Sequence, residues 1–467
     1  MKTEKISTNK KKFSMPHTYA LLFGVIVICT ILTWILPAGE FERVVTDTGR
    51  SVVVPGTFTV IESTPVGPFA MMQSMYAGIK DAASIIALVF LCCAGFGIVI
   101  GSGAVTAGIN ALIKKMGSKA KIAIIPIFMI ILGAASSTFG MFEDTFPFIP
   151  LMAILAINMG YDAIVGVAIV ALGIGMGYSG AALNPFTVGI AQTIAEVPLM
   201  SGIGFRLLCH LAMIVVASVY TIRYALKIEK DPSKSLLYGE DFSDLLAEAP
   251  EEMEFGARQK IILVMFVAGI VLFAYGALNY SWSFGQLTAI AITMAIITGI
   301  LMHKSVNELC EEFSKQFAFA APSVLMIGIA RGILIVLQNG KIIDTIAYYA
   351  SMPLMHVPAI FSGVAMLAFQ TLLNFLIPSG SGQAVVSMPI MTPLADLLGV
   401  SREVAVLAFQ FGDGLSNILW PTAFASIICG LAHVKLDKWW KWFIPLFGLL
   451  FLTQAILIVI AVATGVV

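Results

Sequence analysis

The chain has 467 residues, of which 59% are hydrophobic and only 12% are charged, whereas soluble globular domains carry about 25% charged residues. Long apolar runs recur from residue 19 to the C-terminus, and each is long enough to cross a hydrocarbon core about 30 Å thick. A water-soluble enzyme is therefore excluded, and the sequence predicts an all-α polytopic membrane protein. Lys plus Arg and Asp plus Glu balance at 27 each, so no net field favours nucleic acid as a partner.

Lysine clusters orient the predicted spans, because they remain on the cytoplasmic side of a membrane. Residues 1–66 are predicted to contain a lysine-rich cytoplasmic N-terminus, a first span at 19–36 and an external loop. Within that loop, the alternating run VVTDTGRSVVV favours a small β-hairpin.

Residues 67–226 are predicted to form the first of two repeats, with a surface helix followed by a span at 84–101. Residues 122–135 are too short for a full span and precede the polar run SSTFGMFED, which predicts a re-entrant hairpin whose second arm is 146–157. The next span, 163–195, is interrupted by GYSGAALNPFT. A final span at 205–226 returns the chain to the cytoplasm.

Residues 227–257 are rich in acids and predict a flexible cytoplasmic linker, which is followed by a transmembrane helix pair at 258–304. Residues 305–467 are predicted to form the second repeat, and its expected parts run in the same order as in the first. They are a surface helix at 306–317, a span at 324–337, a hairpin with arms 359–373 and 385–398 around NFLIPSGSGQ, a span at 404–430 broken at FGDGLSNILWPT, and a last span that leaves the C-terminus external.

The first half starts outside the membrane and the second half starts inside, so the two halves are predicted to be inverted repeats. Inverted repeats with discontinuous helices are typical of secondary transporters, in which the helix breaks meet near the bilayer midplane and form the substrate site. Irregular backbone at that depth must line protein or a wet cavity, since lipid offers no hydrogen bonds.

Charged residues are rare at these breaks, which makes the few that occur informative. Glu143 and Asp144 are adjacent at the first hairpin tip, and Asp413 lies inside the second broken span. A charge at such depth costs at least ~2.5 kcal/mol, so we expect each acid to bind a substrate cation, a coupling proton or sodium, or to have a firm partner. The structural alternative is an ion pair with Arg331, which is also a candidate anchor for a substrate carboxylate.

Uncharged polar residues at the same tips and breaks complete the predicted substrate-binding set, although any one of them alone also fits a helix cap. They are Ser136, Ser137, Thr138, Asn184, Asn374, Ser379, Ser381, Gln383, Asn417 and Thr422. A coupling sodium ion, as an alternative to a proton, is predicted near Ser179, Asn184, Ser416 and Asn417. No P-loop, nucleophile elbow or metal-ligand cluster occurs in the sequence, so neither ATP-driven transport nor membrane catalysis is supported.

Two other groups of residues are predicted to lie at the membrane interface. Arg206 is near the end of an apolar segment, where snorkelling is the ordinary explanation. Trp439, Trp440 and Trp442 stand beside lysines and are expected to anchor that end of the last span.

Four stretches carry a family resemblance over nearly the whole chain. FSMPHTYALLFGVIVICTILTWILPAGEFER, GMFEDTFPFIPLM, NFLIPSGSGQAVVSMPIMTPLADLLG and FGDGLSNILWPT resemble the YfcC family, a branch related to DcuC-type carriers within the ion transporter superfamily. The resemblance implies a scaffold domain, a transport domain that moves in elevator fashion, and a homodimer built through the scaffold. It implies two substrate classes, namely four-carbon dicarboxylates and, for some members, arginine exchanged for ornithine.

The acids favour the second substrate class, because Glu143, Asp144 and Asp413 face only Arg331. We therefore predict a basic amino acid exchanger of arginine/ornithine type in the cell membrane, with lipid as its other partner and no nucleic acid. A dicarboxylate carrier coupled to proton or sodium is the alternative, since desolvated carboxylates can be neutral. A channel is the third hypothesis, which interrupted helices alone would permit.

Overall fold

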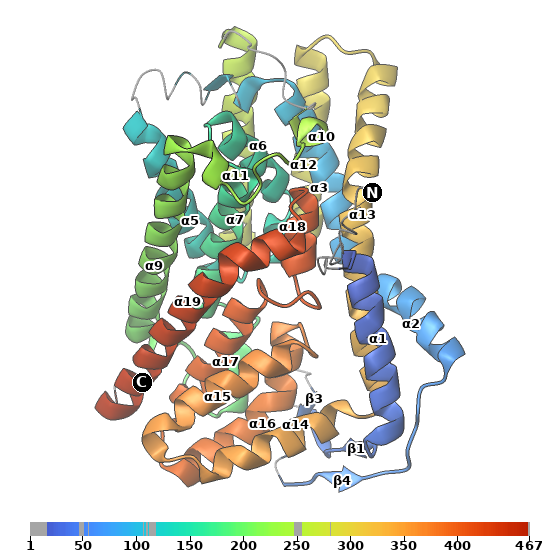
Figure 1. Ribbon diagram of the computed structural model, residues 1–467, viewed down its shortest axis with the longest axis vertical. Coiled ribbons are helices and arrows are strands. Elements are labelled where there is room, and N and C mark those ends of the chain that lie inside the picture. Colours follow the sequence, from blue (N-terminus) through green and yellow to red (C-terminus); the bar gives the residue numbers. More distant parts are fainter. Residues whose placement is uncertain are drawn as a thin grey trace, which may run out of the picture.

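The computed structural model describes residues 16–45, 51–54, 56–105, 107–108, 111, 118–246, 255–280 and 282–465. In this part of the chain, seven helices are long and apolar enough to cross a membrane. The protein is therefore an all-helical, multi-pass membrane protein with two short two-stranded ladders (Figure 1). Several lysines used to predict the orientation lie outside the described residues, namely Lys2, Lys5, Lys10, Lys11, Lys12, Lys114 and Lys115.

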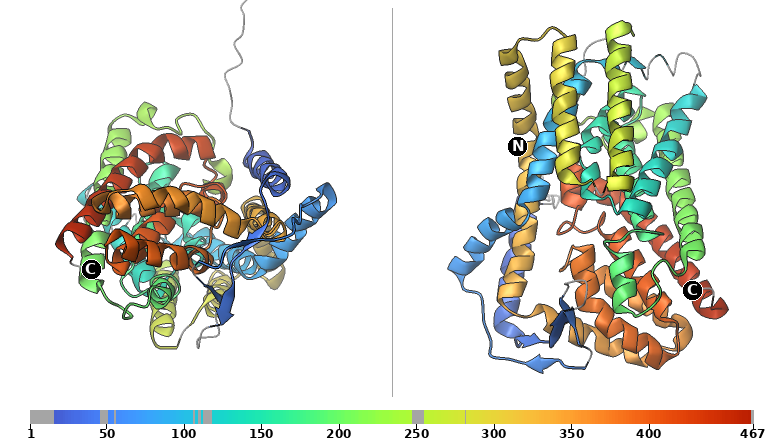
Figure 2. Two further views of the ribbon diagram at one scale, coloured as in Figure 1. Left: turned by 90° about the horizontal axis from the view of Figure 1, so that it is seen from below. Right: turned by 180° about the vertical axis from the view of Figure 1, so that it is seen from behind.

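One group of helices, here called the scaffold unit, is organised around the long helix α13. Helix α13 packs against α1, α2 and α3, while α12 packs against α3 and α11 packs against α12. The members are α1 (Thr18–Ile35), α2 (Pro68–Asp81), α3 (Ala83–Gly101), α11 (Ala257–Tyr280), α12 (Phe284–Leu301) and α13 (Val306–Asn339). Figure 2 shows this unit along one side of the molecule, with α2 projecting from it.

Helix α13 differs from the prediction of a surface helix at 306–317 and a separate span at 324–337. It is continuous over Val306–Asn339, with Pro322 inside it. Its N-terminus is closed by a capping box, in which Ser305 Oγ accepts from Glu308 N at 3.2 Å and Glu308 Oε2 accepts from Ser305 N at 2.7 Å. The change from charged to apolar residues does not end a helix, and prolines are tolerated inside membrane helices. Tyr19 OH of α1 donates to Pro322 O. This bond joins the two helices, and it does not replace the bond that Pro322 cannot donate to Ala318 O.

Glycines bring the backbones of α2 and α13 unusually close. A Cβ added to Gly78 would lie 2.3 Å from Gly328 O and 2.5 Å from Gly332 N. Small residues are what allow membrane helices to approach in this way. The crossing of α2 and α13 is therefore rigid, because any larger side chain would force the two backbones apart.

Gly78→Ala is expected to destabilise the scaffold unit by about 1–3 kcal/mol, since the new methyl group meets backbone atoms that cannot rotate away. The measurement is thermal unfolding of the detergent-solubilised protein. Gly24→Ala in α1 is the matched control, because nothing lies within 4 Å of a Cβ at that position. Equal unfolding midpoints for the two variants would contradict the close crossing.

The second group of helices, here called the core unit, contains the predicted hairpins and broken spans. Its first-half members are α5 (Ser118–Phe139), η1 (Glu143–Thr145), α6 (Phe148–Asn158), α7 (Ala163–Ser179), α8 (Val188–Ile194) and α9 (Ile203–Lys230). Its second-half members are α15 (Ala359–Asn374), α16 (Gly380–Leu398), α17 (Arg402–Ser416), α18 (Ala425–Leu431) and α19 (Leu436–Thr464). In Figure 1, α5–α7 occupy the upper part, α15–α17 occupy the lower part, and α7 and α17 are in contact.

The first predicted hairpin is only partly as expected. Helix α5 has 22 residues, Ser118–Phe139, so the prediction of a short arm at 122–135 is wrong. Its C-terminal hydroxyl residues do not end the helix, since Thr138 Oγ1 donates back to Ala134 O at 2.7 Å. Helix α7 packs against both α5 and α6, which share almost no contacts themselves.

The helices of the second predicted hairpin match its predicted arms more closely, while its re-entrant course stays a prediction. Helices α15 and α16 contact each other and correspond to the predicted arms 359–373 and 385–398, although α16 begins earlier, at Gly380. Both halves of the core unit therefore contain a helix, a turn, further helices and a break in the same order. The inverted relation of the halves stays a prediction.

The acidic linker is more ordered than predicted in its first part. It contains η2 (Pro232–Lys234) and α10 (Ser243–Leu246). Ser235 Oγ donates to Asp162 Oδ2 at 2.6 Å, and Lys435 Nζ lies 2.8 Å from Glu240 Oε2. The prediction of a flexible linker is therefore wrong for residues up to 246, because these contacts attach it to the core unit. Residues 247–254 lie outside the described part of the chain.

The strand pairing of the predicted β-hairpin is confirmed, and its external location stays a prediction. Strand β2 (Arg43–Val45) pairs antiparallel with β3 (Ser51–Val53), and β1 (Gly39–Glu40) pairs with β4 (Thr59–Val60). Arg43 Nη2 bonds both carboxylate oxygens of Asp344 at 2.9 and 2.8 Å. This ion pair attaches the strands to the connection between α13 and α15, which consists of α14 (Ile343–Ser351) and η3 (Met352–His356).

Candidate functional site

Two helix breaks meet inside the core unit, and both were predicted from the sequence. Helix α7 stops before residues 180–187, and α17 stops before residues 417–424. The broken ends touch, since a Cβ on Gly414 would lie 2.5 Å from Ser179 Oγ and 2.6 Å from Ser179 N. The unpaired backbone groups of both breaks are thereby placed in one region within protein rather than against lipid.

Four of the predicted site residues form one buried hydrogen-bonded cluster at these breaks. Asp413 Oδ1 accepts from Asn374 Nδ2 at 2.8 Å and from Asn417 Nδ2 at 3.4 Å. Asn374 Nδ2 also donates to Asn417 Oδ1 at 3.1 Å and to Gln383 Oε1 at 3.2 Å. All four side chains are at most 2% exposed. The cluster therefore joins α15, α16 and α17 around one carboxylate.

Several polar atoms in this region are buried without a hydrogen-bond partner among the described residues. They include Asp413 Oδ2, Asn374 Oδ1, Ser179 Oγ and Thr187 Oγ1. Leaving a buried polar atom unpaired costs about 1–3 kcal/mol, and more for a charged group. Two of these atoms, Asp413 Oδ2 and Asn374 Oδ1, can only accept, and the two hydroxyls can donate or accept. A ligand that brings hydrogen-bond donors or positive charge would therefore suit the two acceptors.

The N-terminus of α16 completes this region. A Cβ on Gly380 would lie 2.5 Å from Tyr178 OH and 2.9 Å from Asp413 Oδ2. Only glycine therefore leaves room between these two groups and the start of α16. Tyr178 was missed by the sequence reading, because an aromatic residue in an apolar helix gives the same signal as a packing residue.

A cavity of about 400 Å³ adjoins the breaks and brings together charges from distant parts of the chain. Glu143 and Asp144, from η1, line it together with Arg331 from α13. Its other polar lining comes from Thr138, Tyr178, Ser283, Ser379, Ser381 and Asn417. Asp144 is 8% exposed, and the cavity is lined by two carboxyl groups and one guanidinium group.

Among the described residues, Arg331 forms no ion pair with Asp413 or with the tip acids, so the structural alternative to a functional role of these acids is not supported. Its ion-pair partner is Asp81, with Nε 3.4 Å from Oδ2. The physical reason is the packing of α13 against α2, whose last residue is Asp81. Glu143 and Asp144 therefore remain available to a ligand in the cavity.

Some predicted site residues act as caps in this structure. Ser137 Oγ accepts from Ala182 N at 3.0 Å, Thr422 Oγ1 donates to Phe375 O at 2.7 Å, and Ser379 Oγ accepts from Gly382 N at 3.3 Å. These contacts fix the breaks and the start of α16. Ser136 is fully buried with an unpartnered hydroxyl.

The predicted sodium ligands differ in whether their polar atoms already have hydrogen-bond partners. Ser416 Oγ donates to Gly412 O at 2.6 Å, and Asn417 is part of the Asp413 cluster. Ser179 Oγ is unpartnered, whereas the unpartnered atom of Asn184 is Nδ2, which is a donor. No cluster of three or more His, Cys, Asp or Glu residues that could hold a metal ion occurs in the described residues. The sodium site stays a prediction.

A buried ion pair that sequence reasoning missed joins the two halves. Arg206 Nη2 lies 2.6 Å from Glu403 Oε2, and the side chains are 1% and 7% exposed. Gln192 Nε2 donates to Glu403 Oε1 at 3.2 Å, and Ser201 Oγ donates to the same oxygen. The prediction that Arg206 snorkels is wrong, because its partner comes from the other half of the chain.

Two of the tryptophans beside the last lysines also differ from the prediction. Trp439 and Trp442 are 0% and 3% exposed, so they are core residues rather than interface anchors. Trp439 Nε1 donates to Ile418 O at 3.0 Å, and Trp440 Nε1 donates to Leu419 O at 2.9 Å. The indoles of Trp439 and Trp440 therefore satisfy two carbonyls of the second break.

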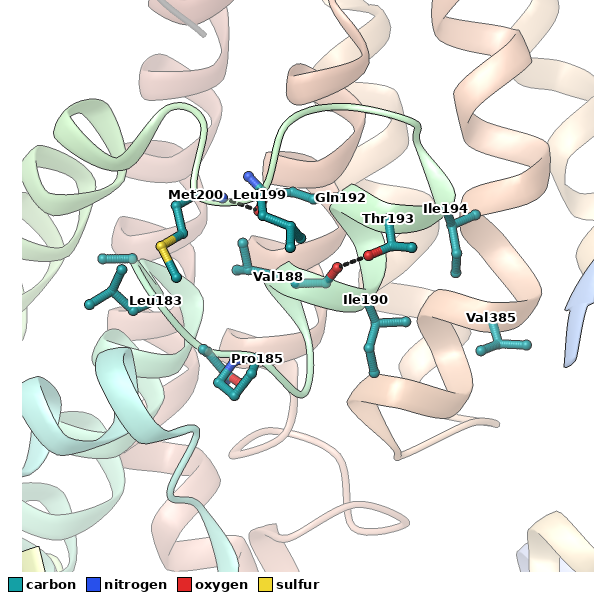
Figure 3. Close-up of a pocket in the computed structure, with 13 residues that line it drawn as sticks. Leu183, Pro185, Val188, Ile190, Gln192, Thr193, Ile194, Leu199, Met200 and Val385 are labelled. Atoms are coloured by element: carbon teal, nitrogen blue, oxygen red, sulfur yellow. Dashed lines mark hydrogen bonds between the residues drawn. The ribbon is translucent and has the colours of Figure 1, made fainter. Parts of the chain in front are cut away.

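A separate cavity of about 250 Å³ lies beside the first break, around α8 (Figure 3). Leu183, Val188, Ile190, Leu199 and Met200 line it. Two of its polar side chains are already hydrogen-bonded, since Met200 N donates to Gln192 Oε1 at 2.9 Å and Thr193 Oγ1 donates to Gly189 O at 2.7 Å. Asn184 also lines this cavity, and its Nδ2 is unpartnered. None of the three predicted acids lines the cavity.

Comparisons with known proteins cover the full chain. A family model described as DcuC: C4-dicarboxylate anaerobic carrier matches residues 15–463. A protein of Escherichia coli K12 named "Putative basic amino acid antiporter YfcC" is 29% identical and is aligned over 97% of this chain and 98% of its own length. An uncharacterized protein of Haemophilus influenzae is 29% identical over 98% and 99% of the two chains. The solved structure of Neisseria gonorrhoeae MtrF, described as an antimetabolite efflux pump, aligns with 18% identity and a TM-score of 0.43 over 96% of this chain and 95% of its own.

Proposed function

We propose a function from one premise, which is that the chain belongs to the DcuC family of C4-dicarboxylate anaerobic carriers. Members of a carrier family move small molecules, so the chain is a membrane transporter and not an enzyme. We propose that it is a secondary active transporter that exchanges basic amino acids, of arginine and ornithine type, across the cell membrane.

The observation that carries this proposal is the excess of acids at the helix breaks. Glu143 and Asp144 line the 400 Å³ cavity, and Asp413 is buried beside it with one oxygen unpartnered. The one arginine of that cavity is already paired with Asp81. A cationic side chain or an α-amino group would compensate the free acids, and desolvated charge of this kind has a large cost without such a partner.

The substrate carboxylate would be received by the N-terminus of α16. This helix has 19 residues, begins at Gly380 and has its N-cap at Ser379, and helix N-termini favour anions. Substrate would then lie between the two tips, at residues 136–144 and 374–383. The name of the E. coli relative, a basic amino acid antiporter, supports this substrate class.

The proposed transport cycle uses the predicted architecture. The two halves would be inverted repeats with re-entrant hairpins, and the core unit would slide against the scaffold unit in elevator fashion. The N-terminus would be cytoplasmic and the C-terminus external, and two copies would associate through their scaffold units. Exchange alone would drive the cycle, with proton or sodium coupling as the alternative.

Counterflow in proteoliposomes tests the function directly. Vesicles loaded with unlabelled arginine should accumulate labelled arginine or ornithine from outside, and succinate or fumarate should neither enter nor compete. Exchange of dicarboxylates without basic amino acids would contradict the proposal and support the alternative suggested by the family's description. Flux without acceleration by internal substrate would indicate a channel.

Glu143→Gln and Asp144→Asn should each reduce arginine counterflow severely, because each amide removes one of the two acidic groups that line the cavity. Expression and the midpoint of thermal unfolding should stay near those of the unmodified protein. Asp437→Asn is the control, since Asp437 forms an exposed ion pair with Lys441 at 3.4 Å in the first turn of α19. Normal counterflow in both tip variants would assign these acids a structural role.

A further inference from the structure

Arg331 is a positive charge that belongs to the scaffold unit but faces the acids of the core unit. It lines both the 400 Å³ cavity and an adjoining cavity of about 620 Å³ between α13 and α16. Among the described residues that line either cavity, it is the one basic side chain. The opposing acids, Glu143 and Asp144, are carried by η1 of the core unit. One cavity is therefore lined by a basic side chain from α13 and by acidic side chains from η1.

The position of Arg331 on its helix is rigid. It lies between Gly328 and Gly332, at the crossing with Gly78 of α2, where the backbones are in contact. Asp81, less than one turn further along α2, holds its Nε at 3.4 Å. The scaffold unit therefore holds both the backbone and the side chain of Arg331.

The two units are in contact at several places. Helix α13 contacts α18, α3 contacts α6 and η1, and α11 contacts α5. Electrostatic attraction between Arg331 and the tip acids would add to these contacts in one position of the core unit. It would be lost when η1 moves along the scaffold.

We propose that Arg331 is a positioning residue that retains the substrate-free core unit by attracting Glu143 and Asp144. A bound cationic substrate neutralises the same acids, removes the attraction and frees the loaded unit to move. This inference rests on the proposed exchange of cationic substrates, and it explains why an empty carrier would stay in place. A ligand shifts such an equilibrium only by interacting differently with the two positions, and the substrate does so by competing with Arg331.

The test compares net efflux with exchange in vesicles loaded with labelled arginine. The native protein should release label rapidly into medium that contains arginine and slowly into substrate-free medium. In Arg331→Gln, the ratio of net efflux to exchange should rise at least tenfold, because the empty unit is no longer retained. Arg331→Lys should restore a low ratio, since the positive charge returns. An unchanged ratio in Arg331→Gln would overturn the inference, and so would loss of both fluxes, which would make Arg331 a substrate ligand.

Two controls separate retention from local structure. Gln338→Ala removes a polar side chain on the same helix that lines only the 620 Å³ cavity, and it should leave the ratio unchanged. Asp81→Asn keeps Arg331 but removes its scaffold partner, so the ratio should stay low. A high ratio in Gln338→Ala would contradict the role of the Arg331 charge, and a high ratio in Asp81→Asn would contradict retention that needs no contact between Arg331 and Asp81.

A second measurement needs no transported substrate, so it distinguishes failure of this inference from failure of the proposed function. Ser381, exposed at the start of α16 and lining both cavities, is changed to Cys in a Cys310→Ser background, since Cys310 is the exposed native cysteine and the other five are buried. Adding Arg331→Gln should change the rate of maleimide labelling at position 381 at least threefold in substrate-free protein, and Gln338→Ala should not. Equal rates would overturn the retention role even if the native protein carried another substrate.

Discussion

Asp413→Asn is expected to lower arginine counterflow by at least about thirtyfold, which corresponds to a loss of about 2 kcal/mol or more when one member of a buried charge pair is neutralised. The amide keeps the size of the side chain and an oxygen that can accept from Asn374 Nδ2, now at 2.8 Å from Oδ1. What it removes is the negative charge and the unpartnered acceptor Oδ2. Initial rates of counterflow, normalised to reconstituted protein, provide the measurement.

The control for this prediction is Asp396→Asn, which removes an acid from a half-exposed ion pair with Arg402 at 2.8 Å, away from the breaks. Its counterflow should be close to that of the unmodified protein. Wild-type rates in Asp413→Asn would show that the buried carboxylate does not act on substrate. A loss of rate accompanied by an equal loss of folded protein would assign Asp413 to stability instead.

Arg206→Ala is expected to lower the free energy of unfolding by about 3–5 kcal/mol, because it leaves the Glu403 carboxylate buried without its partner. The ion pair joins α9 to α17, and Gln192 extends it to α8. Loss of the pair therefore removes contacts between the two halves of the chain. Removing both charges with Arg206→Met and Glu403→Leu should recover much of the stability, since no uncompensated charge then remains.

Thermal unfolding in detergent measures these variants. The single variant should have the lowest midpoint, and the double variant should lie closer to the unmodified protein. Arg402→Gln is the control, because its ion pairs with Glu196 and Asp396 are substantially exposed, and exposed pairs contribute about 0–1 kcal/mol. A double variant as unstable as Arg206→Ala would contradict the explanation from charge compensation.

The helix breaks were predictable because glycine, proline and polar residues interrupt otherwise apolar segments at 180–187 and 417–424. The resemblance of the motifs to the DcuC-related carriers is confirmed, since the family model covers residues 15–463. The errors concern helix length. Hydroxyl residues at the end of α5 and Pro322 in α13 are typical of helix ends in a sequence, yet Thr138 bonds back to its own helix and α13 continues through its proline.

The pairings between distant residues could not be predicted from local patterns. Asp81 and Arg331, or Arg206 and Glu403, are far apart in sequence and meet only because particular helices pack together. By contrast, Asn374, Gln383, Asp413 and Asn417 were chosen for their positions at tips and breaks, and the structure brings them together. The high free-energy cost of burying a charged side chain in a membrane identified which charges were unusual, but it did not identify their partners.

Substrate binding to the purified protein tests the central claim most directly, because it depends on the charge of the site and not on the transport cycle. Calorimetric titration should detect binding of arginine and ornithine and none of succinate or fumarate. The binding should disappear when Glu143, Asp144 and Asp413 are changed together to Gln, Asn and Asn. Binding of succinate by the native protein, with no binding of arginine, would contradict the assignment of these three acids to a cationic substrate.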